Sequence, residues 1–251
     1  TSATINAGTQ YITPSASTSA FIRIVGTHNL GAGSPTNTGN ADDVTVYISN
    51  PSNITNSITF TRPATAVDTT RVAWEIIEYV GAPGGDNEMV VRQQQTATYG
   101  SANTTVTTPA ASGITDGDDV VVFVTAQGNP DTATNYSYGL STAAHATTTG
   151  VTTFTRGASG NAAVVSYAVV EFDGDNWKVQ RSEHTYTAVG SAETEAITAV
   201  NSLSRAFIHT QKRVGSGLNN HSDFGHTVYL SGIGQLSYSL ESSAASPGSH
   251  T

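Results

Sequence analysis

Two glutamates in this chain are each followed by an arginine at a similar spacing, an arrangement that could do acid–base chemistry or hold strands together. The pairs are Glu78 with Arg92 and Glu171 with Arg181. If each pair flanks a symmetric hairpin, carboxylate and guanidinium stand opposite one another, fix the register and offset the cost of partial burial. A glycosidase needs one carboxyl group with a raised pKa, whereas a neighbouring guanidinium lowers it. We therefore interpret both as structural pairs, with Arg62 and Arg156 as further donors, and predict no catalytic residue.

Three acidic turns could supply oxygen ligands to Ca²⁺. They are Asp42-Asp43, Asp116–Asp119 and Asp173–Asn176. None has the spaced ligands and closing glutamate of an EF-hand loop, and Asp-Gly and Asp-Asn are ordinary hairpin sequences. We interpret them as turns and predict no cofactor, with Ca²⁺ as the open alternative.

The histidines give no metal-site pattern. Only His221 and His226 cluster, and two histidines five positions apart in a Gly- and Asn-rich loop make a poor chelate. Ser222 and Asp223 beside them do not form a nucleophile elbow. The chain also has no phosphate-binding loop and no dinucleotide fingerprint. The sequence therefore predicts no metal site and no bound nucleotide.

Aromatic residues are the remaining candidates for ligand contact. Trp177 follows a turn, beside Asn176 and Lys178, and an exposed tryptophan there can stack on a sugar ring or anchor a protein partner. Trp74 and Tyr167 lie inside apolar strands and are expected in the core.

Composition limits the function classes. The 251 residues include 10 basic and 19 acidic side chains, for a formal charge of −9, and only 12% are charged. Few lysines and arginines argue against nucleic-acid binding, and the lack of cysteine excludes disulfides and thiolate metal sites. No apolar run approaches the roughly 20 residues of a membrane span, and Thr1–Thr18 does not read as a signal peptide. Low charge with abundant Thr and Ser favours a virion or an extracellular surface.

Strand signals dominate the sequence. Runs rich in Val, Ile, Thr and aromatic residues are bounded by Gly, Pro, Asn and Asp, and no segment keeps a helical apolar period over three turns. Even 192–200, which could form one turn of helix, is expected as a strand. The other expected strands are Ala20–Val25, Val44–Ser49, Ile58–Arg62, Val72–Tyr79, Val120–Thr125 and Val164–Phe172.

Internal repeats organise these strands. Phe60-Thr61-Arg62 returns as Phe154-Thr155-Arg156, and each precedes a long apolar strand, 72–79 or 165–172. A third copy is partial: 45–49 returns as 227–231, and 20–23 returns as 206–209. The units begin near residues 4, 96 and 186, a period of about 90. We predict an all-β fold of tandem small antiparallel β-sandwich or jelly-roll-like modules, with two full repeats and one partial repeat.

This repeat predicts three regions. Residues 1–108 form the first β-module, 109–203 form the second, and 204–251 form a partial repeat that packs on the others or on a neighbouring subunit. The strand at 164–172 is apolar on both faces until Glu171, which is typical of a central strand that is covered on each side.

The strands Trp74–Tyr79 and Tyr167–Phe172 resemble repeats in tailed-bacteriophage structural proteins, namely decoration, fibre and tail proteins. The order of a Phe-x-Arg strand and then a tryptophan-containing strand also resembles, more faintly, six-stranded H-type lectin modules. The first resemblance implies a non-enzymatic, homo-oligomeric component of a particle or appendage.

The sequence therefore supports two candidate functions. The first is a structural component of a virus particle or extracellular appendage, whose partners are copies of itself and other particle proteins. The alternative is an extracellular carbohydrate-binding module, with Trp177 and the acidic turns as its site; a hydrolase on a β-scaffold is a weaker third. An unfinished third unit would leave a strand edge open. We expect 204–241 to lie near a subunit contact, or Thr4–Thr13 to close the ring within one chain.

Overall fold

The computed structural model describes residues 2–29, 45–62, 69–128, 136–185, 192–215, 226–240 and 248–250. In these residues the regular structure is strand, with short 3-10 turns, so the predicted all-β class is confirmed. The strands are β1 (Ser2–Asn6), β2 (Ala20–Asn29), β3 (Tyr47–Ile48), β4 (Ser57–Thr61), β5 (Thr70–Glu78), β6 (Val90–Tyr99), β7 (Thr105–Thr107), β8 (Val120–Gly128), β9 (Ser141–His145), β10 (Thr152–Arg156), β11 (Ala163–Glu171), β12 (His184–Thr185), β13 (Ala192–Ala196), β14 (Lys212–Val214), β15 (His226–Gly232), β16 (Gln235–Leu240) and β17 (Gly248–His250). The 3-10 turns are η1 (Pro51–Asn53), η2 (Gly117–Asp119), η3 (Tyr136–Tyr138) and η4 (Leu203–Arg205).

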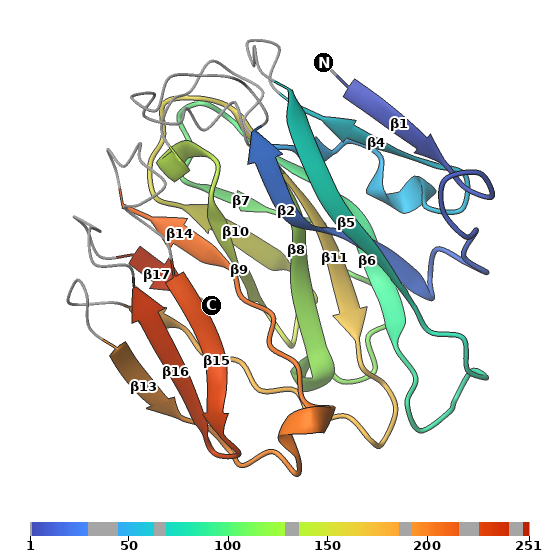
Figure 1. The fold of residues 1–251 in the computed structure, drawn as a ribbon, viewed down its shortest axis with the longest axis vertical. Helices are drawn as coiled ribbons and strands as arrows, with labels where there is room; N and C mark the ends of the chain where they lie inside the picture. Colours follow the sequence, from blue (N-terminus) through green and yellow to red (C-terminus); the bar gives the residue numbers. More distant parts are fainter. Residues whose placement is uncertain are drawn as a thin grey trace.

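The strands form small antiparallel sheets whose order recurs along the chain. Three sheets have the orders β1-β4-β3, β7-β10-β9 and β13-β16-β15, in which each label rises by six. Two more have the orders β6-β11-β8 and β12-β17-β14, and the described part of a further sheet is β2-β5. Strands β8, β11 and β6 lie side by side through the middle of the molecule (Figure 1).

The two Phe-Thr-Arg segments occupy the same place in their sheets. Phe60 lies on β4 and Phe154 on β10, and each of these strands is the middle one of three. Each phenylalanine faces an aromatic ring of the following long strand: Phe60 lies 6.4 Å from Trp74 and Phe154 lies 5.0 Å from Tyr167, between ring centroids. Trp74 and Tyr167 therefore have matching neighbours.

The long strands also share a register. In the β2–β5 pair, Ile24 stands opposite Trp74 and the register shifts at the next residue, so that Gly26 faces Ala73. In the β8–β11 pair, Val124 stands opposite Tyr167 and the register shifts at the same step. A β-bulge adds one residue to one strand and increases the local twist, so the two pairs bend at corresponding points.

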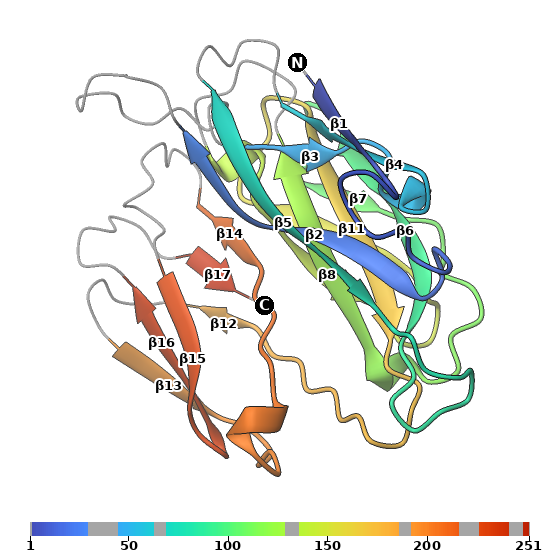
Figure 2. The ribbon, with the colours of Figure 1, turned by 45° about the vertical axis from the view of Figure 1, so that its right-hand side comes forward.

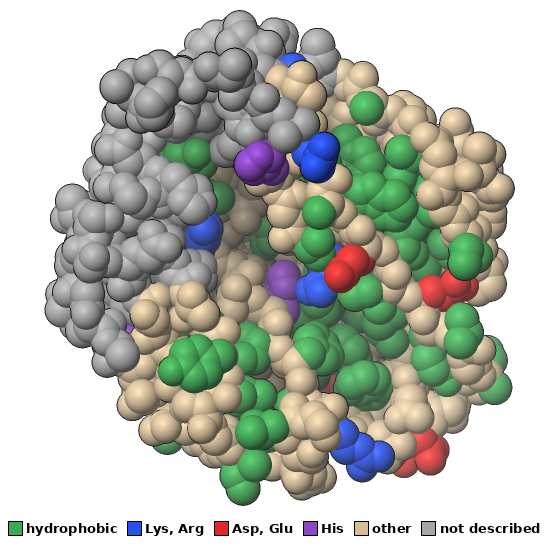
Figure 3. All heavy atoms as spheres, in the orientation of Figure 1, with side chains coloured by type: hydrophobic (Ala, Val, Ile, Leu, Met, Phe, Trp, Pro, Cys, Tyr) green, Lys and Arg blue, Asp and Glu red, His purple; other side chains and the backbone are tan. Residues whose placement is uncertain are grey.

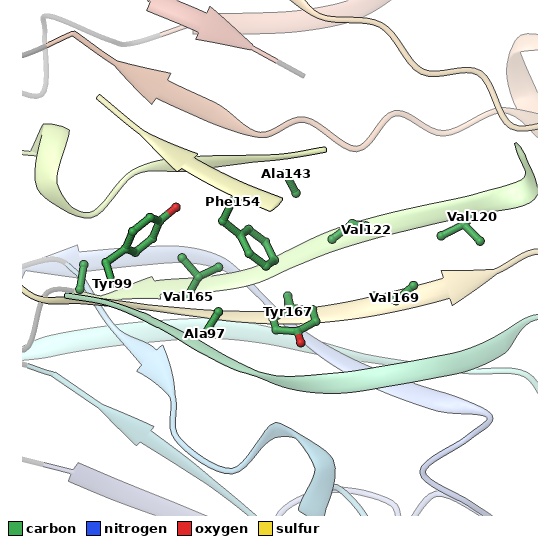
Figure 4. Packing of buried hydrophobic residues seen from close by; sticks show 10 residues of the cluster. Ala97, Tyr99, Val120, Val122, Ala143, Phe154, Val165, Tyr167 and Val169 are labelled. Atoms are coloured by element: carbon green, nitrogen blue, oxygen red, sulfur yellow. The ribbon is translucent and has the colours of Figure 1, made fainter. Parts of the chain in front are cut away.

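The best-covered core lies between β6-β11-β8 and β7-β10-β9. Every residue of β11 is buried, which agrees with the central strand expected at 164–172. Figure 4 shows Phe154 pointing from β10 toward Val122, Val165 and Tyr167. Burying one such side chain fully contributes about 1.5–3 kcal/mol, so these two sheets hold the middle of the chain together.

Sheet pairing crosses the region boundaries expected at residues 108 and 203. Strands β6 and β7, which precede residue 108, pair with β11 and β10. Likewise β12 and β13, which precede residue 203, pair with β17 and β16. The chain therefore passes from one group of strands to the next before β6 and before β12. The segment expected to close a ring, Thr4–Thr13, instead begins in β1, which pairs with β4.

The C-terminal strands pack on the rest of the chain. Strands β13, β16 and β15 lie at the opposite end of the molecule from β1 and β4 in both views (Figures 1 and 2). Gln211, just before β14, accepts a hydrogen bond from the Ala143 N–H at 2.6 Å and donates one to the Val122 carbonyl at 2.5 Å. The C-terminal region therefore contacts the rest of the chain through Gln211, whose side chain is buried.

Candidate functional site

The two predicted Glu–Arg pairs do not form as expected, because neither flanks a hairpin. Arg92 Nε instead donates to the Oε2 atom of Glu171 at 2.5 Å. Glu171 is fully buried, and its Oε1 atom accepts the N–H groups of Thr115 at 2.6 Å and Asp116 at 2.7 Å. The prediction was wrong on partners because β6 pairs with β11 rather than with β5. A carboxylate held by these three donors ties a loop and the edge strand β6 to β11.

The other two members of those pairs have separate partners. Glu78 accepts the N–H and the hydroxyl of Ser15, each at 2.6 Å, and these hydrogen bonds hold the Glu78 pKa below its usual value. Arg181 donates to the carbonyl of Val120 at 2.8 Å and lies 3.6 Å from the Asp118 carboxylate. Both side chains therefore tie loops to strand ends.

Arg156 is the largest of the fully buried side chains, and the prediction that it assists a glutamate is wrong. Its guanidinium donates to four backbone carbonyls, at distances between 2.6 and 3.0 Å, and lies over the Tyr99 ring at 4.7 Å from the centroid. The carbonyls belong to Gly100, Asn103, Tyr138 and Asn161. The planar fork suits several acceptors at once, so this arginine fixes the loops at one end of β10. The repeated Phe-Thr-Arg segment was the signal, but it did not reveal the acceptors.

Trp177 is less available to a ligand than its position after a turn predicted. Its ring packs edge-on against Phe172, with centroids 4.8 Å apart, and the side chain is half-buried. Its indole nitrogen is buried without a hydrogen-bond partner among the described residues. The residue therefore extends an apolar cluster, with part of its side chain still exposed.

That cluster joins segments from distant parts of the chain. Phe123 of β8 lies 4.5 Å from Phe21 of β2 and 4.7 Å from the His209 ring, between centroids. Burial lowers the pKa of His209 to about 4, and the charge of nearby Arg23 acts in the same direction. Its Nε2 atom has no partner among the described residues. Figure 3 shows the face of the molecule that is seen in Figure 1. Histidine, charged and hydrophobic side chains gather beside a recessed area near the centre of that face.

The acidic turns behave as turns where they are described. Asp116 caps η2 by accepting the N–H of Asp118, and Asp173 lies 3.6 Å from Arg92. Among the described residues, no group of three or more His, Asp or Glu side chains could hold a metal ion. Asp42-Asp43 and His221 lie outside the described residues, as does the side chain of His226.

One polar cluster was missed by the sequence reasoning. His184 Nε2 lies 2.8 Å from Glu193, its ring stacks on Tyr238 at 4.2 Å, and the Tyr238 hydroxyl donates to Glu195 at 2.8 Å. Burial raises the Tyr238 pKa to about 12. Glu193 and Glu195 share one face of β13, which was the available signal, and the cluster connects β12 to the sheet of β13 and β16.

Among the described strands, β5 pairs only with β2, whereas β11 lies between β6 and β8. The core-facing residues of β5, namely Val72, Trp74 and Ile76, are therefore only half-buried.

No protein-family model, no curated protein and no solved structure matches this chain. Within the described residues, no helix is long and apolar enough to cross a bilayer.

Proposed function

We propose that this protein is a non-enzymatic structural component of a virus particle or an extracellular appendage, and that it assembles with copies of itself through contacts between β-modules. The observation that carries this proposal is the recurring strand order, β1-β4-β3, β7-β10-β9 and β13-β16-β15. A chain built from one repeated sheet plan already joins like surfaces internally, and the same surfaces suit contacts between copies.

The repeat that we propose has six strands. The second unit runs from β6 to β11 and the third from β12 to β17, and the first runs from β1 to β5 without a counterpart of β6. This is supported by the shared register and the bulge beside Trp74 and Tyr167. In this scheme the C-terminal unit, which the sequence suggested to be partial, has all six strands.

The use of the charged side chains supports an architectural role. Glu171 and Arg156 are buried, and their hydrogen bonds go to Arg92 and to backbone groups of nearby loops. Charged groups that are satisfied in this way hold a fold together and are poor proton donors or acceptors for a substrate. Trp177, the main contact of the carbohydrate-binding alternative, is half-buried against Phe172.

Electron microscopy of the full chain tests the proposal. The purified protein, concentrated stepwise, is expected to form rings, tubes or shells of regular size. Dispersed single molecules at every concentration would contradict self-assembly. A turnover assay with a panel of glycosides tests the enzymatic alternative. Hydrolysis that is lost in Glu193→Gln would contradict a non-enzymatic role.

A further inference from the structure

Phe123 of β8 lies where side chains from all three groups of strands meet. Its buried ring is 4.5 Å from Phe21 of the first group and 6.4 Å from Phe172 of the second, between centroids. From the third group, the His209 ring lies 4.7 Å away and the Phe207 ring 6.5 Å away. Aromatic pairs at such separations are favourable beyond the area that they bury. One ring therefore connects the three groups.

The third group reaches Phe123 through residues 206–211, which we call the docking segment. This segment lies between η4 and β14, has no regular structure and runs alongside β8 (Figure 1). Phe207 also lies 6.0 Å from the Phe172 ring. At the other end of the segment, Gln211 makes the hydrogen bonds to β9 and β8 that are described above. Ring contacts and one amide side chain thus hold the segment in place.

His209 is the ionisable side chain of the docking segment, and its surroundings do not suit a positive charge. Its Nε2 atom is enclosed and has no hydrogen-bond partner among the described residues. The charge that acts on the ring is that of Arg23, which is also positive. Glu75, the nearest counter-charge to Arg23, is engaged by that guanidinium at 2.9 and 3.1 Å. Phe21 and Phe123 bring no charge, so a protonated ring would be buried without compensation.

Docking of the segment and protonation of His209 therefore oppose one another. Burial, with the Arg23 charge acting in the same direction, lowers the pKa of the docked ring to about 4. A histidine ring in water has a pKa of about 6.5. Between these two values a released ring binds a proton and a docked ring does not, so a falling pH favours release.

We propose that the docking segment is a pH-sensitive contact: protonation of His209 releases residues 206–211 from β8 and uncovers Phe123. At neutral pH the uncharged ring stays against Phe123, and the segment holds the third group of strands on the second. In acid the segment leaves, whereas the contacts between the first two groups persist. This property belongs to a single chain, so the inference does not depend on the proposed assembly function.

The other histidine cluster of the third group lies away from this contact. His184 is bound by Glu193 and approaches Glu195 at 4.0 Å, which connects β12 to the sheet of β13. A change of charge there acts between strands of the third group and not on β8. A response that arises from His184 would therefore survive the replacement of His209.

Amide hydrogen exchange on the full chain tests the proposal, because one backbone N–H reports on docking. The Ala143 N–H donates to Gln211 of the released part. The Ile48 N–H is the internal control, since it donates to the Ser166 hydroxyl at 2.9 Å and so links the first two groups. After correction for the intrinsic rates, opening should rise on the order of 50-fold at Ala143 and less than about threefold at Ile48 between about pH 7.5 and about pH 4.5.

Two variants assign the response to His209. His209→Phe keeps an aromatic ring without a titrating group, so the response at Ala143 should fall to that at Ile48. Phe207→Leu is the matched control, which keeps His209 and should keep the full response.

The comparison of the two amides in the unmodified chain stands without any variant. Unchanged protection of Ala143 in acid would refute the proposal, and so would equal losses at Ala143 and Ile48, which would indicate unfolding of the whole chain. A response that persists in His209→Phe would also refute it.

Discussion

Arg92 of β6 and Glu171 of β11 form a hydrogen-bonded ion pair at 2.5 Å, although 79 positions separate them in the chain. The pair exists because β6 pairs with β11 rather than with β5. The first two groups of strands also contact one another, since the Ser166 hydroxyl hydrogen-bonds both the N–H and the carbonyl of Ile48. Such a chain is expected to unfold as one cooperative block over its first two units.

Glu171→Gln is expected to destabilise the protein by about 3 kcal/mol, because it leaves Arg92 without its counter-charge and turns amide hydrogens toward the N–H groups of Thr115 and Asp116. Urea unfolding followed by circular dichroism measures the loss. Glu78→Gln is the matched control, since Glu78 binds a single loop residue, and should cost less than half as much. Equal losses would show that the two carboxylates have similar roles.

Arg156→Met keeps most of the side-chain volume but removes the donors for four backbone carbonyls. Leaving one buried polar group unsatisfied costs about 1–3 kcal/mol, so a total loss of at least about 3 kcal/mol is expected. Thermal unfolding of this variant should be compared with that of Arg71→Met, whose side chain is exposed. A Tm for Arg156→Met within two degrees of the control, on the scale of roughly 2–4 °C per kcal/mol, would contradict the anchoring role.

Gly157→Ala tests the contact between the second group of strands and β14. A Cβ atom on Gly157 would lie 1.6 Å from the Val214 carbonyl oxygen, whereas one on Gly26 would meet nothing within 4 Å. Gly157→Ala should therefore displace β14, at a cost of about 1–3 kcal/mol, and make residues 204–251 more sensitive to limited proteolysis. Gly26→Ala should leave the cleavage pattern unchanged. Identical patterns for both variants would place the C-terminal strands elsewhere.

The sequence predicts single strands well and their partners poorly. Val164–Phe172 is apolar on both faces, so its central place could be read from periodicity alone, and β11 is buried throughout. The partner of β6 could not be read, because neighbours in sequence usually pair, whereas β6 bypasses β5. The acceptors of Arg156 at Gly100 and Asn103 depend on that same long-range pairing, so its environment was also missed.

His209 makes stability depend on pH. Its pKa is about 4 in the folded protein and about 6.5 when unfolded, so between these values the unfolded chain binds more protons. Stability is therefore expected to fall as the pH drops from about 6.5 to 4, by on the order of 3 kcal/mol from this group, and then to level off. His209→Leu should remove that part of the slope. Chemical denaturation at several pH values compares the two, and parallel curves would show that His209 does not contribute.

Multi-angle light scattering on the full chain, across a hundredfold range of concentration, tests self-assembly most directly. The proposed role predicts a particle mass that rises to a defined multiple of the single-chain mass and then remains constant. A mass equal to one chain at every concentration would contradict it.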